Sequence, residues 1–306
     1  MANGSRRTCS LNLKSDIINI IREGIIVKKV EIICFGNELL IGKTVNTNAN
    51  WLGKRLLMLG AELQRITTVR DTIEDMAGAV QEVLERKPDF IITTGGLGTT
   101  FDDMALAAIA KALNRELELN EKAVGFIKER LIKIQEVRGI KLDLSKERLR
   151  MAMVPKGAEV LKNRAGSAPG VVVKENGVTI FSVPGVPREM KAIFDHEISK
   201  YFDVDPNEQF YERSIIVNHV PESELAKAIS KAREKHPLLY VKTHPHSPNA
   251  EGMIEVEIHI TCLCSEEESN QLEEAEKEFV AIIKQMKGAN GNKPRITLQS
   301  EEKISN

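Results

Sequence analysis

The chain has 306 residues, of which 42% are hydrophobic, so it can bury a sizeable core, and its length favours two domains over one. Its 43 lysines and arginines are balanced by 44 aspartates and glutamates, which argues against a large basic surface for nucleic acid. No apolar run reaches the roughly 20 residues of a membrane helix, and no secretory signal opens the sequence, so we expect a cytoplasmic protein without nucleic-acid or membrane partners.

Residues 1–28 are a weakly patterned N-terminal extension, whose isoleucines could form one short amphipathic helix. Beyond it, predicted strands cover 30–35, 61–69 and 89–94, and predicted helices cover 48–59, 72–86, 104–113 and 121–137. Thr47 and Thr72 are expected to cap the first two helices. This alternating order predicts an α/β fold with a parallel sheet wrapped by helices.

After residue 151 the pattern changes to short strands separated by proline-rich turns, and a predicted helix over 188–202 closes this part. The polar stretch 203–208 indicates a domain boundary. The next segment, 208–290, reads as strand, helix, strand, strand and helix, which predicts a small α+β domain. Residues 291–306 are expected to be a polar tail.

The stretch from Gly36 to Thr44 nearly matches the nucleotide P-loop, G-x-x-x-x-G-K-[ST]. Five residues, instead of four, separate Gly36 from Gly42, and three of them are bulky and apolar. Glu38 would also bring a negative charge towards the phosphates. These departures argue against a P-loop, so Lys43 is not expected to bind phosphate.

A stronger signal for anion binding is the glycine loop from Gly95 to Asp103, which reads Gly-Gly-Leu-Gly-Thr-Thr-Phe-Asp-Asp. It follows a buried strand and precedes a helix, where backbone N–H groups can approach an anion. Phe101 stands where the dinucleotide fingerprint has its third glycine, so that fingerprint does not fit. Asp102 and Asp103 could hold a divalent cation that also contacts phosphate oxygens. The alternative is that they only cap the helix beginning near residue 104.

Cysteine and histidine spacing predicts no metal site. Cys9, Cys34, Cys262 and Cys264 lack zinc-binding spacing and are expected to be free thiols in a reducing compartment. His244 and His246 have no third ligand at a suitable spacing, so no histidine metal site is expected.

Four motifs together resemble the CinA family, and specifically its short archaeal form. They cover residues 36–48, 95–103, 163–170 and 184–190. The resemblance implies that residues 29–202 form a molybdenum-cofactor-biosynthesis (MoCF) domain of the MoaB/MogA type. Its implied architecture is a three-layer α/β fold whose parallel sheet becomes mixed at the edge.

For the second domain, the resemblance implies a KH-like α+β fold over residues 208–290. No G-x-x-G loop lies within that range, so RNA binding does not follow from the comparison. Longer relatives carry a further domain that deamidates nicotinamide mononucleotide, and this activity is not expected because the sequence stops before such a domain could begin.

The resemblance also implies an activity, which is hydrolysis of ADP-ribose to AMP and ribose 5-phosphate with Mg²⁺, Mn²⁺ or Co²⁺. The implied partner is a small nucleotide or pterin phosphate, with molybdopterin as a further candidate ligand. Asp102 and Asp103 are expected to hold the metal, and Glu38 and Asp71 to act with them. The expected ligand- and phosphate-binding residues are Gly95, Gly96, Leu97, Gly98, Thr99, Thr100, Asn46, Asn48, Ser167, Pro169, Gly170, Pro184 and Gly185.

Four positions depart from the pattern of the family, namely Asn37, Asn46, Thr99 and Ala105. Many relatives have aspartate at the first two, proline at the third and threonine at the fourth. The loss of two carboxylates and a proline weakens the transfer of metal affinity and rate from the family. Two alternatives stay open: a non-catalytic molybdopterin or nucleotide binding module, which the same glycine loop would serve, and adenylyl transfer to molybdopterin, which suits the fold without a separate supporting motif. Because relatives commonly assemble as dimers or trimers, we also expect a homo-oligomer.

Overall fold

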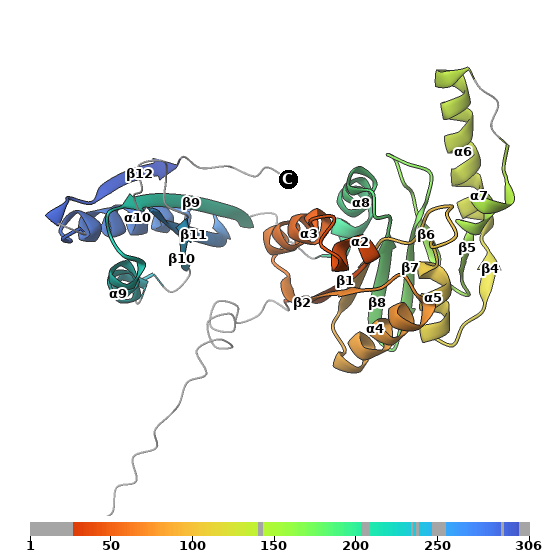
Figure 1. The fold of residues 1–306 in the computed structure, drawn as a ribbon, viewed down its shortest axis with the longest axis horizontal. Helices are drawn as coiled ribbons and strands as arrows, with labels where there is room; N and C mark the ends of the chain where they lie inside the picture. Colours follow the sequence, from red (N-terminus) through yellow and green to blue (C-terminus); the bar gives the residue numbers. More distant parts are fainter. Residues whose placement is uncertain are drawn as a thin grey trace, which may run out of the picture. The chain divides into compact units, whose positions relative to one another are not determined.

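The computed structural model describes residues 27–139, 143–202, 208–233, 235–236, 239–246, 255–288 and 291–299. These residues form two compact units (Figure 1), a larger one within Val27–Val204 and a smaller one within Asp205–Asn306. Residues 1–26 of the predicted N-terminal extension, Cys9 among them, lie outside the described residues.

The larger unit is built on a six-stranded mixed sheet with the strand order β2-β1-β3-β8-β7-β6. Strands β2, β1, β3 and β8 run parallel, and β7 and β6 continue the sheet as antiparallel strands. The strands are β1 (Lys29–Phe35), β2 (Glu62–Val69), β3 (Phe90–Thr94), β6 (Glu159–Leu161), β7 (Gly170–Glu175) and β8 (Val178–Val183). The expected α/β fold with a mixed sheet is therefore confirmed.

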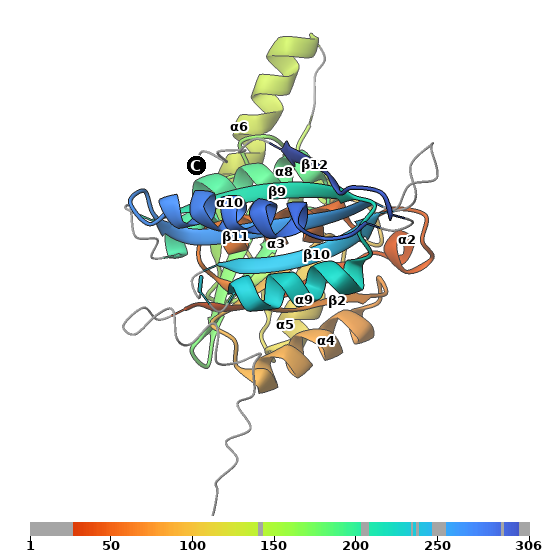
Figure 2. The same cartoon turned by 90° about the vertical axis from the view of Figure 1, so that its left-hand side faces the viewer.

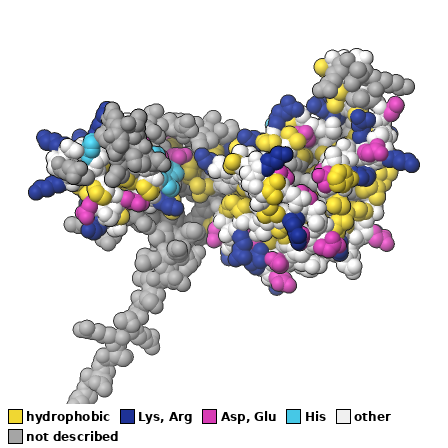
Figure 3. Space-filling model, in the orientation of Figure 1, with side chains coloured by type: hydrophobic (Ala, Val, Ile, Leu, Met, Phe, Trp, Pro, Cys, Tyr) yellow, Lys and Arg dark blue, Asp and Glu magenta, His cyan; other side chains and the backbone are white. Residues whose placement is uncertain are grey.

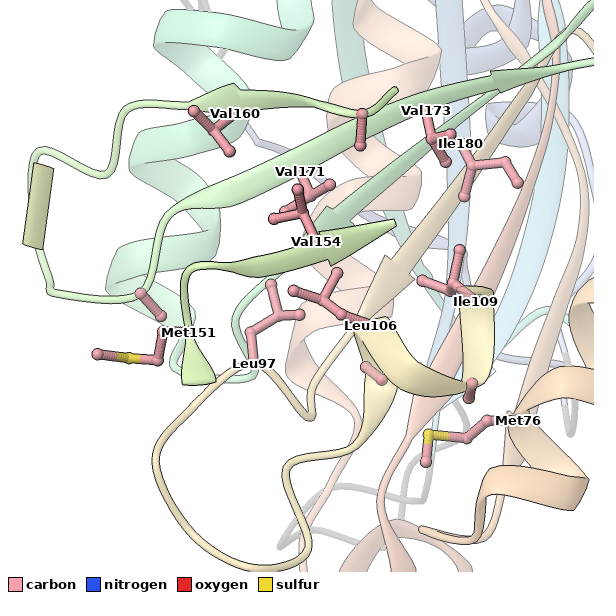
Figure 4. Close-up of a cluster of buried hydrophobic side chains, with 14 of the residues drawn as sticks. Met76, Leu97, Leu106, Ile109, Met151, Val154, Val160, Val171, Val173 and Ile180 are labelled. Carbon is pink, nitrogen blue, oxygen red and sulfur yellow. The ribbon is translucent and has the colours of Figure 1, made fainter. Parts of the chain in front are cut away.

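Two apolar cores, one on each face of the sheet, make this a three-layer structure. All residues of β3 and β8 are buried, as in parallel strands covered on both faces. One face packs against α4 (Ile73–Arg86), α5 (Ala105–Ala112) and α6 (Glu121–Arg138), and the other against α3 (Thr47–Met58) and α8 (Pro187–Ile193). Figure 4 shows Leu97 of the glycine loop among the side chains of the first core, beside Leu106 and Val154.

Side chains cap the N-termini of α3, α4, α6 and α7. Thr72 caps α4 by accepting a hydrogen bond from the Asp75 N–H, as predicted, and Asn120 caps α6 in the same way. The prediction that Thr47 caps α3 is wrong, because the side chain of the preceding residue, Asn46, accepts the hydrogen bond from the Ala49 N–H. In Figures 1 and 2 the C-terminal half of α6 projects beyond the rest of the larger unit.

Several short elements escape prediction because they are too short to show a period. They are α2 (Asn37–Leu40), β4 (Leu117–Leu119), α7 (Lys146–Arg150) and β6. By contrast, β5 (Met153–Pro155) is one of the short strands expected after residue 151. The predicted helix over 188–202 is α8 followed by a π-helical turn, Phe194–Ile198, and a 3₁₀ turn, Ser199–Tyr201. The ring of Phe194 packs edge-on against Trp51 at a centroid distance of 5.5 Å, so this irregular turn places an aromatic anchor in the core.

The smaller unit has a four-stranded antiparallel sheet with the order β10-β11-β9-β12. Its elements are β9 (Glu208–Asn218), α9 (Glu222–Arg233), β10 (Tyr240–His246), β11 (Glu255–Ser265), α10 (Asn270–Lys284) and β12 (Arg295–Gln299). Both helices pack on the same face, where their apolar side chains meet alternate strand residues such as Ile215 and Ile258 (Figure 2).

Two features of the smaller unit differ from expectation. Residues 295–299, interpreted as part of a polar tail, pair with β9 as an edge strand in which only Ile296 packs against the core, which explains the weak sequence signal. Gly288 and Gly291 have G-x-x-G spacing that crosses the predicted domain end at residue 290, and the pair lies between α10 and β12.

Charges on the larger unit are mixed, and in Figure 3 the Lys and Arg side chains of the visible face are interspersed with Asp and Glu. Within the described ranges, no helix combines the length and apolar character needed to cross a membrane.

One buried ion pair supports a stability prediction. The Glu31 carboxylate is 2% exposed and accepts two hydrogen bonds from Arg86, at 2.8 Å from Nε and 2.7 Å from Nη2. Arg86→Met is expected to lower the free energy of unfolding by about 2 kcal/mol, because it leaves a buried carboxylate unpaired. Denaturant unfolding monitored by Trp51 fluorescence would measure this change, since Trp51 is the only tryptophan and packs in the larger unit.

Lys111→Met is the matched control for this substitution. Lys111 pairs with Glu74, whose side chain is 75% exposed, so its removal should change stability by less than about 0.5 kcal/mol. Equal effects of the two substitutions would contradict the importance of burial at Glu31.

Candidate active site

A cleft of about 680 Å³ opens at the carboxyl ends of the parallel strands. Its wall is formed by the residues that follow β1, β2, β3 and β8, the place where ligands bind in open α/β sheets. The predicted site residues that line it are Glu38, Asp71, Gly95, Gly96, Leu97, Gly98, Thr99, Thr100, Asp102, Asp103, Ser167, Pro184 and Gly185. Segments up to about 150 residues apart in the sequence thus share one cavity.

The glycine loop has a backbone that only glycine adopts without strain. Gly95 and Gly96 have φ values of +101° and +68°. A Cβ atom at Gly95 would lie 2.6 Å from the carbonyl oxygen of Phe35, and one at Gly185 would lie 3.4 Å from the Cα atom of Gly95. The end of β1 and the turn after β8 therefore close tightly around the loop.

The loop leaves a row of backbone donors unused. Within the described part of the chain, the N–H groups of Gly96, Leu97, Gly98 and Thr99 donate no hydrogen bond. Successive unengaged N–H groups in a glycine-rich turn form a concave site for an anion. This segment can therefore bind phosphate oxygens.

The two adjacent carboxylates converge on Thr100. Asp103 Oδ2 accepts hydrogen bonds from the N–H and the hydroxyl of Thr100, at 2.8 and 2.6 Å, and Asp102 Oδ1 contacts the same hydroxyl. Gly98 gives room for this arrangement, since a Cβ atom there would lie 2.5 Å from Asp103 Oδ2. Neither aspartate caps α5, whose N-cap residue, Met104, makes no side-chain cap, so the capping alternative is wrong.

The donor set suits a hard divalent cation, although it is incomplete by itself. Two carboxylates that face one hydroxyl offer the oxygen ligands that Mg²⁺ and Mn²⁺ prefer. Among the residues that the structure describes, no group of three or more His, Cys, Asp or Glu side chains is placed to hold a metal ion. Further ligands would have to be phosphate oxygens of a bound molecule and water.

Asp71 and Asn37 join the loops that follow β2 and β1. Asp71 Oδ2 accepts a hydrogen bond from the Asn37 N–H at 2.8 Å, and Asn37 Oδ1 accepts one from the Asp71 N–H at 3.4 Å. The Glu38 side chain folds back over Gly36, where a Cβ atom would lie 2.6 Å from Glu38 Oε1. Asp71 and Glu38 therefore line the cleft from the side of β1 and β2.

Arginines from three helices also line the cleft, and sequence analysis did not select them. Arg130 and Arg188 both donate to the carbonyl oxygen of Ala165, at 3.3 and 3.1 Å, and Arg148 lies nearby in the wall. Arg150 holds the glycine loop from outside by donating to the carbonyl oxygens of Thr99 and Thr100. Only Arg188 belongs to one of the four motifs, the one at 184–190. The other arginines lie in helices without any sequence signal for anion binding.

Asn163 organises the turn that carries Ser167. Its Oδ1 atom accepts hydrogen bonds from the N–H groups of Ala165 and Gly166, and its Nδ2 atom donates to Ala168 O and to Glu189 Oε2 at 2.8 and 2.6 Å. A Cβ atom at Gly166 would overlap the Glu189 carboxylate. Asn163, Gly166 and Glu189 thus shape the cleft wall together. These contacts join the motif at 163–170 to the motif at 184–190, which the sequence of either motif alone does not indicate.

Four predicted ligand-binding residues do not line the cleft. Asn46 caps α3, and Asn48 donates from Nδ2 to the carbonyl oxygen of Gly185 at 2.7 Å, so both support the cleft from behind. Pro169 lies next to Gly170, which begins β7 and is buried.

Burial raises the pKa of the Cys34 thiol, and hydrogen bonds with Asn46 and Thr94 only partly oppose this effect, so the thiol stays neutral at neutral pH.

Comparison with known proteins identifies the larger unit. Residues 31–203 match the family model MoCF_biosynth, described as a probable molybdopterin binding domain. A protein from Sulfurisphaera tokodaii is 41% identical over 229 residues, which cover 74% of this chain and 84% of that protein. A protein from Saccharolobus islandicus is 40% identical over 259 residues, which cover 84% and 95%.

Among solved structures, the chain is similar to the protein CinA, of unknown function, from Thermoplasma acidophilum. The two are 33% identical, with a TM-score of 0.50, over 56% of this chain and 98% of the other. The expected similarity to CinA is therefore confirmed for the larger unit.

Proposed function

The chain belongs to the MoCF family of probable molybdopterin-binding domains, and from this membership and the geometry of its cleft we propose that it is a metal-dependent pyrophosphatase. Its substrate is ADP-ribose or a related nucleotide. Water adds to one phosphorus of the pyrophosphate and the bridging P–O bond breaks, which gives AMP and a sugar phosphate.

The observation that supports this proposal best is the sharing of one cleft by the four unengaged loop N–H groups and the Asp102–Asp103 pair. The N–H groups and the neighbouring arginines fit the negative charge of a pyrophosphate. A divalent metal, when bound, supplies positive charge that neutralises the phosphate oxygens and favours attack by water. Asp102 and Asp103 would hold it, and Asp71 and Glu38, which line the same cleft, would orient water or accept its proton.

The activity is tested by incubating the purified full-length chain with ADP-ribose and Mg²⁺, Mn²⁺ or Co²⁺ and measuring AMP by chromatography. We expect AMP and ribose 5-phosphate in equal amounts, and no product when a chelator removes the metal. Absence of turnover with each metal, together with tight binding of ADP-ribose, would contradict the hydrolase and support a binding module.

That second candidate, a non-catalytic module for molybdopterin or a nucleotide, is favoured by the hydrogen bonds that already engage Asp102 and Asp103 with Thr100. A carboxylate pair that serves to shape the loop would leave the anion site intact without a catalytic metal. Adenylyl transfer to molybdopterin would use the same cleft, and a test with ATP and molybdopterin separates it from hydrolysis of ADP-ribose.

Two further expectations complete the proposal. The smaller unit is KH-like, which its β-α-β-β-α order over β9 to α10 supports. The chain assembles as a homo-oligomer, a dimer or trimer, which light scattering coupled to size exclusion would measure.

A further inference from the structure

A second cavity, of about 370 Å³, lies beside the cleft, between α6 and the segment that follows β6. We call it the α6 groove. Four basic side chains and a single acidic one line it, together with one aromatic ring: Arg130, Lys133, Lys162, Arg164, Glu129 and Phe126. This imbalance contrasts with the nearly even charge of the whole chain.

Glu129 cancels only part of the positive charge. Its two carboxylate oxygens lie 2.8 Å from Lys133 Nζ and 2.9 Å from Lys162 Nζ, and these hydrogen bonds lower the pKa of Glu129 to about 2. One carboxylate therefore bridges two ammonium groups in the lining of the groove. Arg164 Nη2 lies 3.9 Å from Glu197 Oε1, and Glu197 also pairs with Lys200 at 3.1 Å. The groove keeps a surplus of positive charge.

The groove continues into the cleft. Arg130 lines both cavities, and Arg164 directly precedes Ala165, which lines the cleft. The Arg130 Nε atom is buried and has no hydrogen-bond partner within the described residues, and Nη2 reaches Ala165 O only at 3.3 Å. A buried guanidinium donor without an acceptor indicates a missing anionic or polar partner at the junction of the two cavities.

From these contacts we propose that the α6 groove binds a phosphomonoester carried by the same molecule that occupies the cleft. The inference rests on the proposed function, because it takes the pyrophosphate to lie on the glycine loop. A phosphomonoester carries up to two negative charges at neutral pH and suits several ammonium and guanidinium donors at once. The chain then prefers a nucleotide with a third phosphate, such as ADP-ribose 2′-phosphate, over ADP-ribose.

The test compares binding of ADP-ribose and ADP-ribose 2′-phosphate to the full-length chain by calorimetry at constant ionic strength. We expect the 2′-phosphorylated ligand to bind about tenfold more tightly. Lys162→Met should remove most of this preference and leave the affinity for ADP-ribose within about twofold. Glu129→Gln should increase the preference, because it removes the negative charge from the groove. Lys111→Met, which removes a lysine paired with Glu74 outside both cavities, should leave the preference unchanged.

Equal affinities of the unmodified chain for the two nucleotides would overturn the subsite, as would an equal loss of affinity for both in Lys162→Met. Tight binding of inorganic phosphate alone, without any preference between the nucleotides, would overturn the proposal that the phosphomonoester belongs to the molecule in the cleft. Hydrolysis is measured separately. A preference without hydrolysis of either ligand supports the subsite and overturns the proposed activity, whereas hydrolysis of both ligands at equal affinity does the reverse.

Discussion

Asp103→Asn is expected to lower the rate of ADP-ribose hydrolysis at least about 100-fold at saturating Mg²⁺, Mn²⁺ or Co²⁺. Asparagine has nearly the same shape, so its oxygen can still accept the hydrogen bond from the Thr100 N–H. It lacks the negative charge that a divalent cation needs from its ligand. The loss should therefore fall on turnover and metal affinity, with little change in the free energy of unfolding.

Asp89→Asn is the matched control for this prediction. The Asp89 carboxylate also accepts a backbone hydrogen bond, from the Lys29 N–H at 2.8 Å, but it lies at the amino ends of the strands, across the sheet from the cleft. This variant should keep the activity of the unmodified chain. Metal-dependent hydrolysis that survives in Asp103→Asn would show that the acidic pair only shapes the loop and would move the metal site elsewhere.

The position of Asn37 gives a physical reason to separate the fold from the chemistry. The resemblance to CinA implies aspartate at this position, whereas Asn37 exchanges two hydrogen bonds with Asp71 through its backbone N–H and its side-chain oxygen. An aspartate could keep both contacts, but it would add a negative charge close to Asp71. Asparagine therefore keeps the two loops joined without placing a second carboxylate beside Asp71, so the fold does not depend on an aspartate here, and we expect any effect of the replacement to fall on the proposed metal binding.

Sequence pattern was sufficient for two elements with strong apolar signals. The strand β3 is a continuous buried run, the helix α4 has an apolar face and a capping residue, and both appear within one residue of the predicted limits. The apolar run from Leu39 to Ile41 is different. Leu39 packs against the core, but Leu40 and Ile41 are 49% and 75% exposed, and no residue of the short helix α2 is fully buried.

The candidate site also has features that the local sequence indicates and features that depend on tertiary contacts. The glycine loop could be recognised because glycines at positive φ and adjacent carboxylates are local features. Arg130 and Arg148 could not be recognised, since a helical arginine has no local mark that distinguishes a cleft wall from solvent. Arg130 is placed by its contact with the carbonyl oxygen of Ala165, and Arg148 is known only from its position in the cleft wall. Asn46 and Asn48 do not line the cleft: Asn46 caps α3, a second role that the same residue type at a helix start can serve, and Asn48 donates to the carbonyl oxygen of Gly185.

Gly95→Ala is expected to lower the free energy of unfolding by about 3 kcal/mol and to abolish measurable binding of ADP-ribose. At φ +101° an alanine is strained by about 1–3 kcal/mol. Its Cβ atom would also lie 2.6 Å from the carbonyl oxygen of Phe35, and this oxygen cannot move aside easily because it belongs to the backbone. Relief requires β1 and the glycine loop to move apart, which disturbs the row of N–H groups. Trp51 fluorescence during denaturant unfolding measures the first effect, and calorimetry measures the second.

Gly78→Ala separates this strain from the general effect of replacing a glycine. Gly78 lies within α4 with open space around the position of a Cβ atom, so alanine there should stabilise the helix by about 0.5–1 kcal/mol and leave ligand binding unchanged. The free energy of unfolding should therefore fall in Gly95→Ala and rise in Gly78→Ala, because the two positions differ in backbone conformation and in the space around a Cβ atom. If Gly95→Ala instead keeps both stability and binding, the loop must have an alternative backbone conformation at this position, and the anion site would have to be built from the arginines of α6, α7 and α8 and not from the loop N–H groups.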